Sequence, residues 1–162
     1  MEARKEILNI LIISLDEKFT KDVSSHLASE LEMFSVDCKE FVEYDLINPK
    51  DVLDKCGLEY LRKRERGALS SVCEYHNTVI SINYDLFKRN FDLFEYSLIV
   101  YLKLDDKFLG DIINTIEEKN YNEFLLMQAD IQLEVNEKDE EEVKNNLLNL
   151  LGENLWIYVT RH

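Results

Sequence analysis

The fold is decided by the stretch Asn9-Ile10-Leu11-Ile12-Ile13-Ser14, which runs directly into Leu15-Asp16-Glu17-Lys18-Phe19-Thr20-Lys21-Asp22. The apolar run is typical of a buried strand, and the spacing after it is that of an amphipathic helix. A nucleotide-binding chain carries a glycine-rich loop at such a turn, because the backbone needs positive φ angles and bare N–H groups around the phosphate. This chain has no glycine before Gly57. Its turn offers three carboxylates and a phenyl ring instead.

The composition indicates one globular domain over residues 1–162. Hydrophobic residues make up 46% of the chain and charged residues 32%, so a core and a solvated surface are both available. The formal net charge of −14 repels phosphate backbones and anionic lipids, which excludes nucleic acid and membranes as expected partners. Two interpretations of the charge remain open, namely simple solubility and attraction to a basic partner protein.

Three widely spaced cysteines, Cys38, Cys56 and Cys73, form no Cys-x-x-Cys pair. We therefore expect reduced thiols and a cytoplasmic location. His26 and His76 have no partners at ligand spacing, so no metal site is predicted. The apolar run near the N-terminus is too short to span a bilayer or to direct secretion.

Strand-like apolar clusters alternate with helical patterns along the chain. This alternation predicts an α/β fold with three layers, αβα, around a mostly parallel five-stranded sheet. The expected strands cover residues 10–13, 34–38, 78–82, 97–102 and 131–135.

Two glycines set the expected boundaries of helices. Gly57 is placed to open a helix whose apolar face includes Leu58, Leu61 and Leu69. Gly152 is placed to stop the last helix, which begins at Glu140. Beyond it, residues 155–159 have strand composition, and we expect an extra strand at the sheet edge or a cover for an apolar face.

Read together, these segments resemble the shikimate kinase family, small phosphate-loop kinases of aromatic amino-acid biosynthesis, from Asn9 to about Leu151. The clearest match is Gly57-Leu58-Glu59-Tyr60-Leu61-Arg62-Lys63-Arg64-Glu65, which looks like the family's Gly-Glu-x-x-Phe-Arg-x-x-Glu helix opening. The resemblance implies a P-loop kinase-like topology.

The family's phosphate loop falls over residues 14–21 in a fit without gaps, and every glycine of this Walker A motif is missing. Thr20 takes the position of the phosphate-binding lysine, and a slip of one residue would bring Lys21 there. Asp16, Glu17 and Asp22 already crowd the positive end of the first helix, where a triphosphate would meet like charge. The motif is therefore degenerate, and we expect no cofactor.

The resemblance also implies a substrate side. Asp37 matches the family's magnesium-linked acid, and Arg62 matches an arginine that pairs with the shikimate carboxylate. The family's lid arginines are missing, because no arginine lies between Arg89 and Arg161. Tyr121 stands roughly where a substrate-binding arginine is expected.

We therefore expect a catalytically inactive, shikimate-kinase-like pseudoenzyme that binds a protein partner or a small anionic ligand and has no catalytic residues. Lys21, Asp37 and Arg62 are the candidate ligand-binding residues. The alternative is a divergent small-molecule kinase that uses these three residues with Mg-ATP. A third interpretation, a receiver-like signalling domain, lacks its phosphoacceptor aspartate, because Asn83 follows the third strand.

Overall fold

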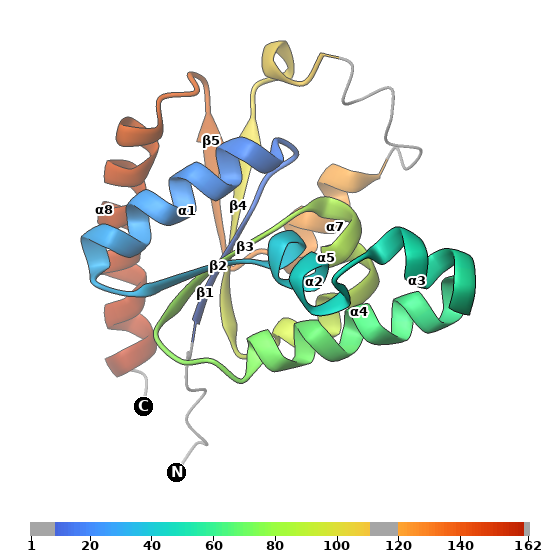
Figure 1. The fold of residues 1–162 in the computed structure, drawn as a ribbon. Coiled ribbons are helices and arrows are strands. Elements are labelled where there is room, and N and C mark those ends of the chain that lie inside the picture. Colours follow the sequence, from blue (N-terminus) through green and yellow to red (C-terminus); the bar gives the residue numbers. More distant parts are fainter. Residues whose placement is uncertain (1–8, 111–119, 161–162) are drawn as a thin grey trace.

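A parallel sheet forms the centre of the molecule (Figure 1). The structure is a computed structural model, and it describes residues 9–110 and 120–160. Strands lie in the order β2-β3-β1-β4-β5, and every neighbouring pair is parallel. The predicted fold class and all five predicted strands are confirmed. Their bounds are β1 Asn9–Ile13, β2 Phe34–Asp37, β3 Thr78–Ile82, β4 Ser97–Leu104 and β5 Ile131–Val135.

The three inner strands are buried on both faces, as expected for a parallel sheet between helical layers. Every residue of β1 and of β3 is buried, and β4 is buried at all but one position. Leu11 lies opposite Ile80 on one side and Ile99 on the other. The continuous apolar runs of the sequence are thus explained by burial on two faces.

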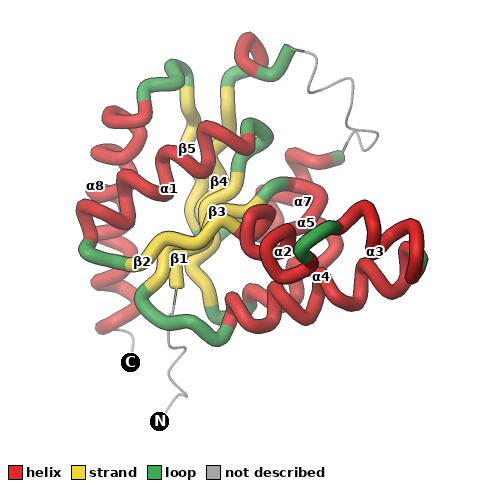
Figure 2. Tube along the Cα trace, viewed as in Figure 1, coloured by secondary structure: helices red, strands yellow, loops and turns green. Residues whose placement is uncertain are grey.

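Helices cover both faces of the sheet (Figures 1 and 2). On one face, α1, Glu17–Leu31, packs against α8, Glu140–Thr160. The other helices lie on the opposite side in Figure 1, and short 3-10 turns follow α5 and β4. No helix in the described ranges is both long and apolar enough to cross a membrane. The remaining bounds are α2 Cys38–Leu46, α3 Pro49–Cys56, α4 Leu58–Cys73, α5 Tyr84–Asn90, α7 Tyr121–Gln128, η1 Phe91–Phe94 and η2 Asp106–Phe108.

Three strands lead into helices through the same local device. The side chains of Asp16, Asp37 and Asn83 accept hydrogen bonds from the first free N–H groups of α1, α2 and α5, at distances of 3.0, 3.1 and 2.9 Å. Asp and Asn are preferred at this position because a helix start leaves N–H donors without partners. Side chains at the carboxyl edge of the sheet therefore provide acceptors for the free N–H groups at the starts of these helices.

The two glycine predictions have opposite outcomes. Gly57 precedes α4 with a φ of +86°, which confirms it as the opening residue. Gly152 does not stop α8, and the predicted strand over 155–159 is wrong, because the helix continues to Thr160. A glycine ends a helix when it adopts a left-handed conformation, and Gly152 has no positive φ. Val143 and Leu147 are buried, as their helical spacing predicted.

Candidate functional site

The turn between β1 and α1 is closed by its own hydroxyl groups. The Ser14 and Thr20 hydroxyl oxygens lie 2.5 Å apart, and both residues are almost fully buried. Thr20 also donates to the carbonyl of Asp16, at 2.9 Å. No residue from 9 to 31 has a positive φ angle. The backbone of residues 9–31 therefore contains no nest that depends on a left-handed residue.

Asp16 occupies the positive end of α1. One carboxylate oxygen accepts from the Phe19 N–H, and the other lies 2.6 Å from the Lys138 ammonium nitrogen. Burial acts to raise the pKa of Asp16, but the hydrogen bonds from Lys138 and Phe19 outweigh it, and the pKa is lowered. A carboxylate thus stands charged where phosphate would lie in a nucleotide-binding turn.

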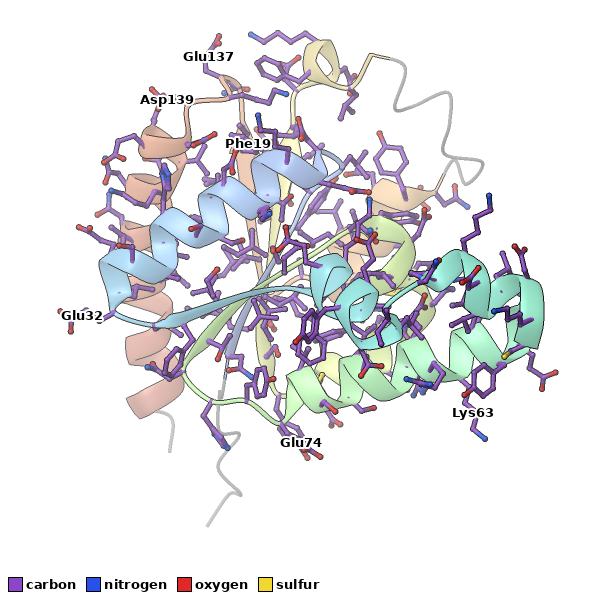
Figure 3. All side chains as sticks on the ribbon, in the orientation of Figure 1. Phe19, Glu32, Lys63, Glu74, Glu137 and Asp139 are labelled. Atoms are coloured by element: carbon purple, nitrogen blue, oxygen red, sulfur yellow. The ribbon has the colours of Figure 1, made fainter. Side chains whose placement is uncertain are left out.

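Lys138 also belongs to a set of contacts that joins three loops. It lies over the Phe108 ring at 5.5 Å, and Lys107 lies over the same ring at 4.9 Å. Lys107 in turn pairs with Glu137 at 3.0 Å. Figure 3 shows Glu137 and Phe19 at the same end of the molecule. The loops after β1, β4 and β5 are therefore linked by charge at the carboxyl edge of the sheet.

Beside this turn, a cavity of about 390 Å³ opens between α1, α2 and the end of β3. Two of the predicted site residues, Lys21 and Asp37, line it together. Lys21 forms an ion pair with Glu40, and Lys39 pairs with Glu17 at 3.2 Å. Both ion pairs bridge α1 and α2. Two of the three lysines that line the cavity are thus paired with glutamates of the same wall.

The carboxylate of Asp37 is already engaged on both oxygens. Ser81 donates its hydroxyl hydrogen to one oxygen at 2.7 Å, and the Glu40 N–H donates to the other at 3.1 Å. Within the described ranges, no group of three His, Cys, Asp or Glu residues is arranged to hold a metal ion. As the structure stands, Asp37 caps a helix.

Arg62 does not line the cavity that Lys21 and Asp37 share. It donates instead to the buried carboxylate of Glu65 at 3.0 Å, and Arg89 donates to both oxygens of the same carboxylate, at 3.0 and 3.1 Å. Burial acts to raise the pKa of Glu65, but Arg89, Asn90 and Arg62 outweigh it and lower the pKa. The three candidate residues are therefore not brought to one place, because α4 directs Arg62 toward Glu65.

A second cavity, of about 280 Å³, lies at the end of β4 and includes Tyr121 in its wall. Tyr101 donates its hydroxyl hydrogen to Asn122 at 2.8 Å. Burial raises the pKa of Tyr101 and, together with the nearby Asp106, that of Tyr121. Tyr121 thus lies at the carboxyl edge of the sheet, near the end of β4. Residues 111–119 of the expected lid fall outside the described residues.

Two features of the molecule were missed by sequence reasoning. The Asp16–Lys138 pair joins residues far apart in the chain, and the Glu65 cluster draws Arg89 and Asn90 from another helix. Lys138 carried a usable signal, because it follows the last strand and parallel strands end at one edge. Arg89 carried none, since its partner is set by how α5 packs on α4.

No protein-family model and no curated protein sequence matches the chain. Solved structures do match its fold. Shikimate kinase from Aquifex aeolicus vf5 is 20% identical with a TM-score of 0.72, covering 91% of this chain and 98% of its own. Shikimate kinase from Acinetobacter baumannii in complex with shikimate is 16% identical with a TM-score of 0.73, covering 93% and 96%.

More distant kinases share the architecture. Thymidylate kinase from Candida albicans is 15% identical with a TM-score of 0.52, and the match covers 92% of each chain. The higher TM-scores of the two shikimate kinases agree with the resemblance carried by residues 57–65. The strand order and the helical layers of this chain are those of the shikimate kinase and P-loop kinase fold.

Proposed function

We propose that the chain is a shikimate-kinase-like protein that has lost ATP binding and acts in the cytoplasm as a binding or regulatory protein. Its ligand is a protein partner or a small anionic molecule. The net charge of −14 argues against nucleic acid and anionic membranes as partners.

One observation carries the proposal: the Asp16 carboxylate and the Lys138 ammonium fill the positive end of α1. Phosphoryl transfer depends mainly on cations positioned around the moving phosphate. Here Lys138 is paired with Asp16, and Lys21 with Glu40. A nucleotide would have to break these pairs and approach a carboxylate, and it would gain no nest that depends on a left-handed residue.

Calorimetry with Mg-ATP tests the proposal, with an active shikimate kinase measured alongside as the positive control. We expect no saturable heat for this chain. An assay of ATP-dependent phosphorylation of shikimate should likewise stay at background. A micromolar dissociation constant for Mg-ATP, with or without product formation, would overturn the proposal.

The anionic ligand can be sought at the cavity that holds Lys21. A thermal-shift panel of shikimate, phosphate, ADP and magnesium would show a specific ligand as a rise in melting temperature. Lys21→Ala should abolish such a rise, whereas Lys63→Ala, an exposed lysine outside the cavity, should keep it. Silence across the panel favours a protein partner.

The alternative, a divergent small-molecule kinase using Lys21, Asp37 and Arg62, is favoured by one observation: Lys21 and Asp37 share one cavity. Arg62→Ala separates the two functions. A divergent enzyme should lose affinity for its acceptor, whereas a binding protein that works through the α1–α2 cavity should keep its ligand, because Arg62 lies outside that cavity.

A further inference from the structure

The cavity of about 280 Å³ at the end of β4 lies between the carboxyl ends of β1 and β4. The chain leaves β1 toward β2 and leaves β4 toward β5, in opposite directions along the sheet. Open α/β sheets bind their ligands at such topological switch points. The cavity shares no lining residue with the cavity between α1 and α2, so the two are separate.

The two charged side chains of this cavity have no partner in the described part of the chain. Lys103 is half-buried and Asp106 is exposed, and they do not pair with each other although both line the cavity. Neighbouring lysines differ, because Lys107 is held by Glu137 and Lys138 is paired as well. A charge that is partly removed from water without a partner is costly. A ligand that carries both opposite charges would relieve this cost.

Neutral polar groups complete the wall of the cavity. Tyr101 donates its hydroxyl hydrogen to the side-chain oxygen of Asn122 at 2.8 Å, which leaves the amide N–H groups of Asn122 as donors for a ligand. Burial, and then the nearby carboxylate of Asp106, raise the pKa of Tyr121, so this hydroxyl stays protonated at neutral pH. The effect of Asp106 also indicates that its carboxylate lies near the Tyr121 hydroxyl group.

The remaining wall is apolar and aliphatic. It consists of Leu15, Leu104 and Leu109, all of which are buried. Sites for small molecules usually enclose about 300–1,000 Å³. At about 280 Å³ the cavity suits a ligand much smaller than a nucleotide. Its lining asks for an anionic group, a cationic group and a short aliphatic part in one small molecule.

We propose that this cavity binds a free α-amino acid with an aliphatic side chain. Lys103 and the amide of Asn122 hold its carboxylate, and Asp106 holds its ammonium group. The aliphatic side chain packs against the three leucines. The inference goes beyond the proposed binding role, and its test involves no nucleotide, so the two can fail separately.

Calorimetry with L-leucine as the probe tests the inference on the parent chain, beside two analogues that each lack one charged group. 4-Methylpentanoate lacks the ammonium group, and 3-methylbutylamine lacks the carboxylate. We expect saturable binding of leucine and an affinity at least about tenfold weaker for each analogue, because each loses a charge-assisted hydrogen bond. Equal affinity for leucine and 4-methylpentanoate would indicate an anion site only and would overturn the inference, as would no saturable binding of leucine.

Two variants with matched controls assign the charged groups. Lys103→Gln should weaken leucine binding about tenfold or more, whereas Lys63→Gln, at an exposed lysine outside the cavity, should change it by less than about twofold. Asp106→Asn should make leucine and 4-methylpentanoate bind alike, whereas Asp54→Asn, at an exposed residue of α3, should keep the preference for leucine. An unchanged preference in Asp106→Asn would contradict the assigned role.

Chemical-shift changes on adding leucine should centre on the backbone amides of Lys103 and Asn122. Changes centred on Lys21 and Asp37 would place the ligand between α1 and α2 and would overturn the inference. Thermal melts of the variants without leucine separate loss of the site from loss of the fold. The analogue series needs no variant, so it decides the question even where a variant folds poorly.

Discussion

The two edges of the sheet use their polar groups in different ways. At the carboxyl edge, Asp16, Asp37 and Asn83 cap the helices that follow them, and Lys138 and Lys21 are held by carboxylates of the same chain. At the amino edge, the exposed carboxylate of Glu95 pairs with no residue in the described ranges. Polar groups that already hold partners gain little from a ligand. A ligand that used Lys21 or Lys138 at the carboxyl edge would therefore have to displace their internal partners.

The largest loss of stability is expected from substitution of Glu65 on the amino-edge side. Glu65 binds Arg89 and Asn90 at the end of α5, next to η1. Its carboxylate is buried and holds Arg62, Arg89 and Asn90. Glu65→Ala leaves these donors unpaired. We expect a loss of about 2–3 kcal/mol in the free energy of unfolding, below the usual cost of a broken buried pair because water still reaches both arginines.

Urea denaturation measures this loss, with Glu59→Ala on the same helix as the control. Glu59 is exposed and has no partner in the described residues, so its removal should cost less than about 1 kcal/mol. Equal losses in the two variants would show that the Glu65 contacts add no more stability than an exposed glutamate does.

Substitutions at the carboxyl edge should lower the free energy of unfolding by less than Glu65→Ala does. Asp16→Ala removes the cap of α1 and the pair with Lys138, which should lower the free energy of unfolding by about 1–2 kcal/mol. Asp16→Asn keeps the capping oxygen and loses only the charge pair, so its cost should be about 0–1 kcal/mol. Thermal melts of the two variants separate capping from charge. A larger loss for asparagine than for alanine would contradict this view of the turn.

Both edges should lose stability in acid for the same reason. The pKa values of Asp16 and Glu65 are lowered in the folded chain. Their contribution is therefore complete above the ordinary carboxyl pKa of about 4 and is lost as the pH falls through the lowered folded values. Urea midpoints measured from neutral to acidic pH should fall less steeply for Asp16→Asn than for the parent chain. Tyr44→Ala, which removes no carboxylate, should fall in parallel with the parent.

The smallest expected effect concerns α8, which runs alongside the sheet between its two edges (Figure 1). Gly152 is exposed, has no positive φ, and leaves open space where a Cβ would stand. Gly152→Ala should stabilise the chain by about 0.5–1 kcal/mol in chemical denaturation. Gly57→Ala, at a φ of +86°, should destabilise it. If Gly152→Ala destabilised the chain, the result would favour the prediction that the last helix ends at Gly152.

The strands were predictable because the sheet is parallel and buried, which leaves continuous apolar runs such as residues 10–13 and 78–82. The prediction of a strand in the C-terminal segment was wrong because it relied on composition. Residues 155–159 have strand composition, but β-propensity reflects the surroundings more than the backbone, and the helix continued through a glycine. Composition alone could not decide between these outcomes.

The candidate site was predictable only in part. Lys21 and Asp37 came together because each follows a strand of the same sheet, and such strands end at one edge. Arg62 followed from a motif match, and the structure shows it paired with Glu65 of the same helix. The Lys138–Asp16 pair spans most of the chain, and the only indication of it in the sequence is that Lys138 follows the last strand of a parallel sheet. The missing glycines predict a turn that does not bind phosphate, and this stays a prediction, whereas the pairing of Asp16 with Lys138 was not predicted.

The central place of β1 has a consequence for how the protein is made. Its neighbours are β3, which begins at Thr78, and β4, which ends at Leu104. As a nascent chain leaves the ribosome, β1 emerges with both edges open and waits for these distant segments. Non-local parallel pairing of this kind is slow and exposes apolar surface. Stalled or truncated products that end before β4 should therefore depend on chaperones to avoid aggregation.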